Sequence, residues 1–216
     1  MIGIVGGTFD PIHFGHLRMA LELSTRLALD EVRFIPSARP PHRGEPDATG
    51  RQRLKMVELA IAGETRFILD DREYHRGEES YMVDTLESLR ADMGPDVSLL
   101  LIMGRDAFQG LTAWHRWQSL LTLAHIVVVA RPISESDLES DLCGRDPVLQ
   151  KFYDRHHTTD QNNLHKRRCG FIFIAETTAL GISASSIRKM IAAQESPRFL
   201  LPETVLSYIE EHKLYI

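Results

Sequence analysis

The sequence predicts an α/β fold in which a doubly wound, mostly parallel sheet carries helices on both faces. Two observations indicate this class. Short apolar runs rich in Val, Ile and Phe recur along the chain, and buried parallel strands are continuously apolar in this way. Segments with helical spacing lie between the runs, and this alternation favours a parallel sheet.

The predicted elements follow these patterns along the chain. Helical stripes lie at residues 17–28 and 54–61, and late helices are predicted at about 184–193 and 202–212, the second opening at Pro202. The predicted strands are residues 2–5, 32–36, 67–69, 97–103, 125–130 and 171–175. Together they predict a Rossmann-like architecture.

One domain accounts for the chain. Its 216 residues are enough to bury a core. The polar stretch 134–168 breaks the alternation, so we expect a surface excursion with one short helix near 147–155. Residues 183–216 are expected to form a small C-terminal helical part.

Composition excludes several classes of protein. A net charge of -5 does not favour non-specific binding to DNA or to an anionic membrane. The chain shows no signal peptide and no apolar run near the roughly 20 residues that span a bilayer. Cys143 and Cys169 lie too far apart for a CxxC motif. We therefore expect a cytoplasmic protein that binds neither nucleic acid nor membrane.

The first motif is GGTFDPIHFGH, from Gly6 to His16, which joins the first predicted strand to a helical stripe. It falls at the carboxyl edge of the sheet, where open α/β folds bind ligands. Gly6 and Gly7 let a phosphate approach main-chain N–H groups, and the following helix has a partly positive N-terminus. The motif predicts an anion site.

His13 and His16 are three residues apart, so both imidazoles project from one face of the first helical turn. Two such donors suit a polyphosphate whose charge moves toward the leaving pyrophosphate. Two ordinary histidines, or a zinc site, are the alternatives. Zinc needs a third ligand, and Asp10 is the only carboxylate close in sequence, so we expect no metal held by side chains.

The second motif is ISASSIR, from Ile182 to Arg188. Ser183 is suited to cap a helix by accepting an orphan N–H. Arg188 lies just over one turn further on, so a single helix offers a hydroxyl, N–H groups and a guanidinium to one polyphosphate. Together with the first motif it predicts a nucleotide site. The spacings of the P-loop and of the dinucleotide fingerprint are absent.

These two motifs resemble the HxGH and ISxxxIR signatures of the nucleotidyltransferase superfamily. Further blocks are similar to those of bacterial nicotinate-nucleotide adenylyltransferases: PPHR at 40–43, SYMVDTL at 80–86, GRDAF at 104–108, AW at 113–114 and ARP at 130–132. The resemblance extends over nearly the whole chain. It implies transfer of AMP from ATP to nicotinate mononucleotide, giving nicotinate adenine dinucleotide and pyrophosphate in NAD biosynthesis. Mg²⁺ would arrive with ATP.

The resemblance also implies site residues. His16 would be the principal catalytic residue, with His13 and Arg188 beside it. The acceptor's pyridine ring would lie on Trp114 and its carboxylate on main-chain N–H groups around Thr85 and His115, with Arg131 near phosphate. The implied ATP contacts are Gly7, Thr8, Phe9, His13, His16, His42, Arg43, Gly104, Asp106, Ile182, Ser183 and Arg188.

Two positions depart from the family pattern. His115 stands where relatives often carry Tyr, and Ala130-Arg131 replaces a doubled arginine seen in some relatives. From the residues alone, Trp114 and Trp117 would be expected to pack a helix onto the core, and Asp106 to cap one.

Other functions stay open at this stage. A sister transferase acting on nicotinamide mononucleotide or phosphopantetheine would share the HxGH motif. A non-catalytic nucleotide sensor would share the fold, whereas a nicotinamide-dependent oxidoreductase would need a glycine fingerprint. The expected partners are ATP and nicotinate mononucleotide, and the sequence leaves a homo-oligomer as one option.

Overall fold

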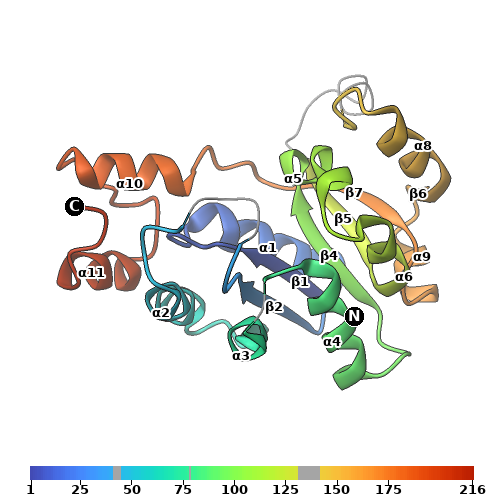
Figure 1. The fold of residues 1–216 in the computed structure, drawn as a ribbon, viewed down its shortest axis with the longest axis horizontal. Helices are drawn as coiled ribbons and strands as arrows, with labels where there is room; N and C mark the ends of the chain where they lie inside the picture. Colours follow the sequence, from blue (N-terminus) through green and yellow to red (C-terminus); the bar gives the residue numbers. More distant parts are fainter. Residues whose placement is uncertain (41–44, 78, 131–141) are drawn as a thin grey trace.

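A parallel sheet forms the centre of the protein in the computed structural model, which describes residues 1–40, 45–77, 79–130 and 142–216 (Figure 1). Within these residues seven strands pair in the order β3-β2-β1-β4-β5-β7-β6, and every pairing is parallel. The strands are β1 Ile2–Gly7, β2 Glu31–Pro36, β3 Phe67–Leu69, β4 Leu99–Gly104, β5 His125–Ala130, β6 His157–Thr158 and β7 Ile172–Glu176. The predicted fold class is confirmed.

Helices cover both faces of this sheet (Figure 1). The principal ones are α1 Phe14–Arg26, α2 Gly50–Ile61, α4 Met82–Met93, α8 Pro147–His156, α10 Ala184–Ala192 and α11 Glu203–Glu211. Shorter ones are α3 Arg72–Arg76, α5 Arg105–Gln109, α6 Leu120–Leu123 and α9 Asn162–Lys166. Two 3₁₀ turns, Leu111–Ala113 and Trp117–Ser119, lie between α5 and α6.

Alternate residues of the central strands supply two separate hydrophobic cores. In β4, Leu100 and Ile102 belong to the core that contains α1, α2, α10 and α11, whereas Leu99 and Leu101 belong to the core under α4, α6 and α8. Because side chains of a strand alternate between faces, a strand buried on both sides must be apolar throughout. This is why the strands appear in the sequence as unbroken apolar runs.

The predicted strands are confirmed within two residues at each end, and one strand was missed. β6 has only His157 and Thr158, a polar pair too short to show a period. The described part of the predicted excursion also contains α9 and buries Leu149 and Leu164. Pro202 is the N-cap of α11 rather than its first helical residue.

The sheet reverses its winding between β1 and β4. From β1 the order runs outward through β2 and β3, and from β4 it runs outward through β5, β7 and β6. A crevice opens at such a switch point, beyond the carboxyl ends of the strands. β1 ends there at Gly7 and β4 at Gly104.

No helix of the described residues is both long and apolar enough to cross a membrane.

Candidate active site

His13 and His16 meet at the N-terminus of α1, immediately beyond β1. His13 is the N-cap of α1, and the two rings stack with centroids 3.8 Å apart and an interplanar angle of 27°. The predicted placement on one helical face is confirmed. The Phe9 and His16 rings meet edge to face with centroids 5.1 Å apart. Phe9 has a φ of 50°, so the chain turns sharply just before the histidines.

Gly15 makes the stacking of these rings possible. A Cβ at this position would lie 2.9 Å from both Cε1 and Nδ1 of His13. No real Cβ lies that close to other atoms, and the His13 ring is buried and cannot easily move away. The glycine of the HxGH motif is therefore needed for space between the imidazoles.

The protonation of both rings follows from their surroundings. Burial lowers the pKa of His13 to about 4. Burial and the neighbouring His13 together lower the pKa of His16 to about 3. The main-chain N–H of His13 donates to Nδ1 of His16 at 3.3 Å, which assigns the His16 proton to Nε2. At neutral pH the site therefore holds two uncharged imidazoles, and His16 keeps one N–H donor for a ligand.

The loop that carries the first motif is held by a buried arginine that sequence reasoning missed. Arg53, on α2, is 1% exposed. Its Nη1 donates to the carbonyls of Thr8 at 2.8 Å and Ser37 at 2.7 Å, and its Nε donates to the carbonyl of Ala48 at 3.3 Å. One cation thus joins the loops that follow β1 and β2 to the start of α2. The only signal of this role in the sequence is that Arg53 lies three residues before Met56 and four before Val57, on the apolar face of α2.

Asp10 is also part of this loop, and it acts as an acceptor inside the protein. Its carboxylate is 5% exposed and accepts the main-chain N–H groups of Asp47 at 3.0 Å and Ala48 at 3.2 Å. Among the described residues, no three His, Cys, Asp or Glu side chains are grouped so that they could hold a metal ion.

The second motif packs directly on the first. Ser183 caps α10 as predicted, since its hydroxyl accepts the main-chain N–H of Ser186 at 3.2 Å. The Ile182 carbonyl lies 3.8 Å from where a Cβ of Gly15 would be. Arg188 reaches back from α10, and its Nη1 donates to the main-chain carbonyl of Asp10 at 2.8 Å. Motifs that begin 176 residues apart in the chain, at Gly6 and Ile182, therefore form one site.

Gly104 and Asp106 lie at the end of β4, the neighbour of β1 in the sheet. Gly104 is the N-cap of α5, and the exposed Asp106 lies within its first turn. The expectation from the residues alone that Asp106 caps a helix is therefore wrong. Both residues are at the carboxyl edge of the sheet, as the first motif is.

A small hollow opens beside Gly15 of the first motif. Its volume is about 150 Å³, and it is lined by Gly15, Met19, Val129, Ala130, Thr177, Thr178, Ala179 and Leu180. A larger and more open hollow of about 500 Å³ lies beside α1 at Arg18, Glu22 and Arg26. Polar groups there already pair within the protein, because Glu22 accepts the Thr178 N–H at 2.7 Å. Of the two, only the smaller hollow is lined by a residue of the first motif, Gly15.

Two of the residues implied for the acceptor, Thr85 and His115, lie around the N-terminus of α4, on the face of the sheet opposite α1. A Cβ at Gly6 would lie 2.4 Å from Cε of Met82, so the first turn of α4 rests on the end of β1. The ring of Tyr81, the N-cap of α4, contacts the ring of His115 with centroids 4.4 Å apart. Arg116 has a φ of 49° and bonds to Glu87 of α4 at 2.6 Å.

Trp114 and Trp117 lie in the segment that these contacts hold. Both pack in part against the core under α4. They do not belong to an α-helix, since Trp114 ends one 3₁₀ turn and Trp117 begins the next. The expectation of a helix bearing both tryptophans is wrong, because Trp114 has an extended backbone and Arg116 a left-handed one.

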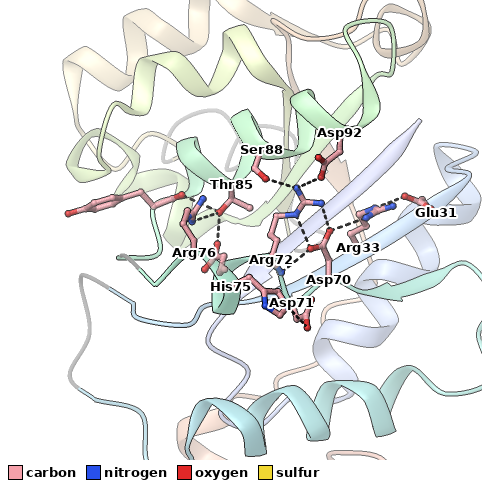
Figure 2. Close-up of polar contacts among 12 residues, drawn as sticks. Glu31, Arg33, Asp70, Asp71, Arg72, His75, Arg76, Thr85, Ser88 and Asp92 are labelled. Atoms are coloured by element: carbon pink, nitrogen blue, oxygen red, sulfur yellow. Dashed lines mark hydrogen bonds and ion pairs between the residues drawn. The ribbon is translucent and has the colours of Figure 1, made fainter.

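Thr85 lies inside a polar network between α3 and α4 (Figure 2). It is fully buried, and its main-chain N–H donates to the Tyr81 carbonyl at 3.2 Å. Its hydroxyl donates to Oε1 of the buried Glu73 at 2.6 Å and accepts from Nη2 of Arg76 at 3.1 Å. The polar groups of Thr85 are therefore all bonded within the protein, and they fix the N-terminus of α4.

A second, separate set of polar contacts fixes α3 against the sheet and α4. Asp70, which follows β3, accepts from Arg72 at 2.8 Å and from Arg33 at 3.0 Å (Figure 2). Arg72 also donates to Ser88 at 2.9 Å and to Asp92 at 3.1 Å on α4.

Three of the residues implied by the resemblance, His42, Arg43 and Arg131, lie outside the described residues.

Known proteins are similar to this chain in sequence and in fold. The family model described as cytidylyltransferase-like matches residues 4–190. A probable nicotinate-nucleotide adenylyltransferase of Pseudomonas aeruginosa (strain UCBPP-PA14) is 46% identical over 214 residues, which cover 99% of this chain and 96% of the relative. The probable nicotinate-nucleotide adenylyltransferase of Methylococcus capsulatus is 46% identical over 216 residues, covering 100% and 99%.

Among solved structures, the nicotinic acid mononucleotide adenylyltransferase of Plasmodium falciparum, complexed with NaAD, has the same fold. Its TM-score is 0.71 at 18% identity, with 99% of this chain and 96% of that chain covered.

Proposed function

Because the chain belongs to the cytidylyltransferase-like family, we propose that it is a nicotinate-nucleotide adenylyltransferase of NAD biosynthesis. In the reaction, a phosphate oxygen of nicotinate mononucleotide attacks the α-phosphorus of ATP. The bond from that phosphorus to the bridging oxygen of the β-phosphate breaks. The products are nicotinate adenine dinucleotide and pyrophosphate.

The observation that carries this proposal is the meeting of the two motifs at one sheet edge. The stacked pair His13 and His16 stands at the N-terminus of α1, and Arg188 reaches the same loop from α10. A helix N-terminus, neutral imidazole donors and a guanidinium are groups that hold a polyphosphate without forming a covalent bond to it. Relatives that share 46% identity over nearly the whole chain carry the same activity in their names.

Alignment and charge neutralisation are the tasks of such a site, since the acceptor is already an anionic nucleophile. His16 would donate its Nε2–H to oxygens on which charge grows as pyrophosphate leaves. The ATP phosphates would also accept hydrogen bonds from His13 and Arg188. The resemblance adds His42 and Arg43 to these donors. The main chain at Gly7 and Thr8 would lie close to the phosphates, and Ser183 would offer them its hydroxyl. ATP enters as its Mg²⁺ complex, because Mg²⁺ keeps waters and prefers phosphate oxygens.

The base and the acceptor would occupy opposite sides of this phosphate site. We propose that the hollow beside Gly15, together with Gly104 and Asp106, receives the adenosine half. Trp114 would stack on the pyridine ring, and its carboxylate would meet main-chain groups near Thr85 and His115. Arg131 would lie near phosphate. We also propose a cytoplasmic location, which the free thiols Cys143 and Cys169 support.

A single assay tests the proposal. Purified protein is given ATP and Mg²⁺ with nicotinate mononucleotide, nicotinamide mononucleotide or phosphopantetheine in separate reactions, and the product is identified by mass. We expect nicotinate adenine dinucleotide and pyrophosphate in equal amounts. Equal use of the two pyridine nucleotides would overturn the acceptor specificity. Tight ATP binding without product from any acceptor would favour a nucleotide sensor.

A further inference from the structure

We propose that Tyr215, the penultimate residue of the chain, is a positioning residue that acts through Asp10 to hold Arg188 in place for the ATP polyphosphate. The proposal rests on the proposed function for the identity of the ligand. It assigns a role in nucleotide binding to the C-terminal end of the chain, which neither motif includes.

The contact between Tyr215 and Asp10 joins residues 205 positions apart. The Tyr215 hydroxyl donates to Oδ1 of Asp10 at 2.7 Å. Burial, and the Asp10 carboxylate, raise the pKa of Tyr215 far above its usual range, so the hydroxyl keeps its proton and remains a donor. With the N–H groups of Asp47 and Ala48, this is the third donor to one buried carboxylate.

Arg188 is held by the same loop that this carboxylate organises. Its Nη1 donates to the main-chain carbonyl of Asp10 at 2.8 Å and lies 3.9 Å from Oδ2 of Asp10. Its Nε lies 2.6 Å from Oδ2 of Asp47. Both groups that orient the guanidinium therefore belong to residues whose positions depend on the Asp10 carboxylate. Asp10 is also only three residues before His13, the N-cap of α1.

The turn that carries the Tyr215 ring contains two residues with left-handed backbone angles. Lys213 and Tyr215 have φ values of 50° and 65°, in the left-handed region that side chains disfavour. Such backbone persists only where surrounding contacts over-determine it. Leu214 between them is buried, and the Tyr215 hydroxyl lies 3.9 Å from Sδ of Met56 on α2. The fold thus holds a strained turn in place, and the Tyr215 hydroxyl at its end bonds to Asp10.

The test compares Tyr215→Phe with the matched control Tyr208→Phe, whose ring lies on α11 and stacks on His212, the C-cap of that helix. Binding of a non-hydrolysable ATP analogue is measured by calorimetry, and KM for each substrate by steady-state kinetics. For Tyr215→Phe we expect the Kd for the analogue and the KM for ATP to rise about 5- to 10-fold, since a factor of ten is what one strong hydrogen bond provides. In Tyr215→Phe, the KM for the acceptor should stay as in the wild type. The control Tyr208→Phe should keep the melting curve of the wild type.

A double-mutant cycle separates positioning from general support of the fold. If Tyr215 acts through Arg188, the Tyr215→Phe effect on the analogue's Kd should vanish in an Arg188→Gln background. An unchanged Kd in Tyr215→Phe, or the same fold-change in both backgrounds, would overturn the inference. Asp10→Asn provides a second variant and should weaken analogue binding in the same way. Failure of the wild type to bind the analogue would instead overturn the proposed function.

Discussion

The imidazole rings of His13 and His16 stack with centroids 3.8 Å apart, and both are uncharged at neutral pH because burial lowers their pKa values to about 4 and about 3. Such a pair of neutral donors at a helix N-terminus would hold a phosphate without a buried positive charge on either ring.

Replacement of His16 should slow the chemical step. His16→Ala removes the Nε2–H donor, and we expect kcat to fall by about 10²-fold or more while the fold is kept, as for loss of one transition-state donor. His16→Gln restores an N–H near the same place and should recover part of the rate. His165→Ala, an exposed residue of α9, is the control in the same steady-state assay. A turnover near that of the wild type in His16→Ala would remove His16 from the mechanism.

Acid should destabilise the protein through the same two rings. The folded pKa values lie below the unfolded value of 6.5, so the unfolded chain binds more protons between about pH 6.5 and pH 4. Stability therefore falls as pH drops through this window, by up to about 1.4 kcal/mol per pH unit for each histidine. Urea unfolding at stepped pH should give a smaller slope for His16→Gln than for the wild type. Parallel curves for both proteins below pH 6.5 would contradict the assignment, and above pH 7 the two slopes should coincide.

Gly15→Ala should reduce activity by displacing a ring rather than by unfolding the helix. The added Cβ would lie 2.9 Å from two atoms of the His13 ring. We expect kcat to fall at least about 10-fold, because small displacements of a positioning group are costly. Gly110→Ala is the matched control, since its Cβ would make only ordinary contacts of 3.7 Å and 3.9 Å. If the two variants retain equal turnover, the spacing role of Gly15 is refuted.

Thr85→Val should disturb the acceptor side and the stability of the fold together. The change keeps the shape but removes the hydroxyl that links Glu73 to Arg76, leaving buried polar groups unpaired. We expect a loss of about 1–3 kcal/mol in the free energy of unfolding and a higher KM for the acceptor, with KM for ATP little changed. Thr85→Ser, which keeps the hydroxyl, should restore both values. A rise in KM for ATP alone would contradict the placement of α4 on the acceptor side.

Local patterns in the sequence were enough to predict the sheet and the two motifs. Strands such as β5 are apolar along their whole length because both faces are covered, and this pattern is visible without coordinates. The cap at Ser183 and the shared face of His13 and His16 depend on neighbours three residues away. β6 was missed because two polar residues carry no period, and the tryptophan segment was misjudged because 3₁₀ turns lack a clear signature.

What the sequence alone determined is therefore the fold class, the strand-to-helix turn of the first motif and the helix that faces it, since propensity and periodicity act between near neighbours. Only the tertiary structure decided the partners of the buried polar groups. Arg53 joins the loops that follow β1 and β2, and Tyr215 reaches Asp10 across 205 residues, because the chain returns to the same place in space. A hydrogen bond between distant residues depends on the whole path of the chain, and no local pattern encodes it. The uncharged state of the two histidines was likewise decided by burial, which exists only once the protein has folded.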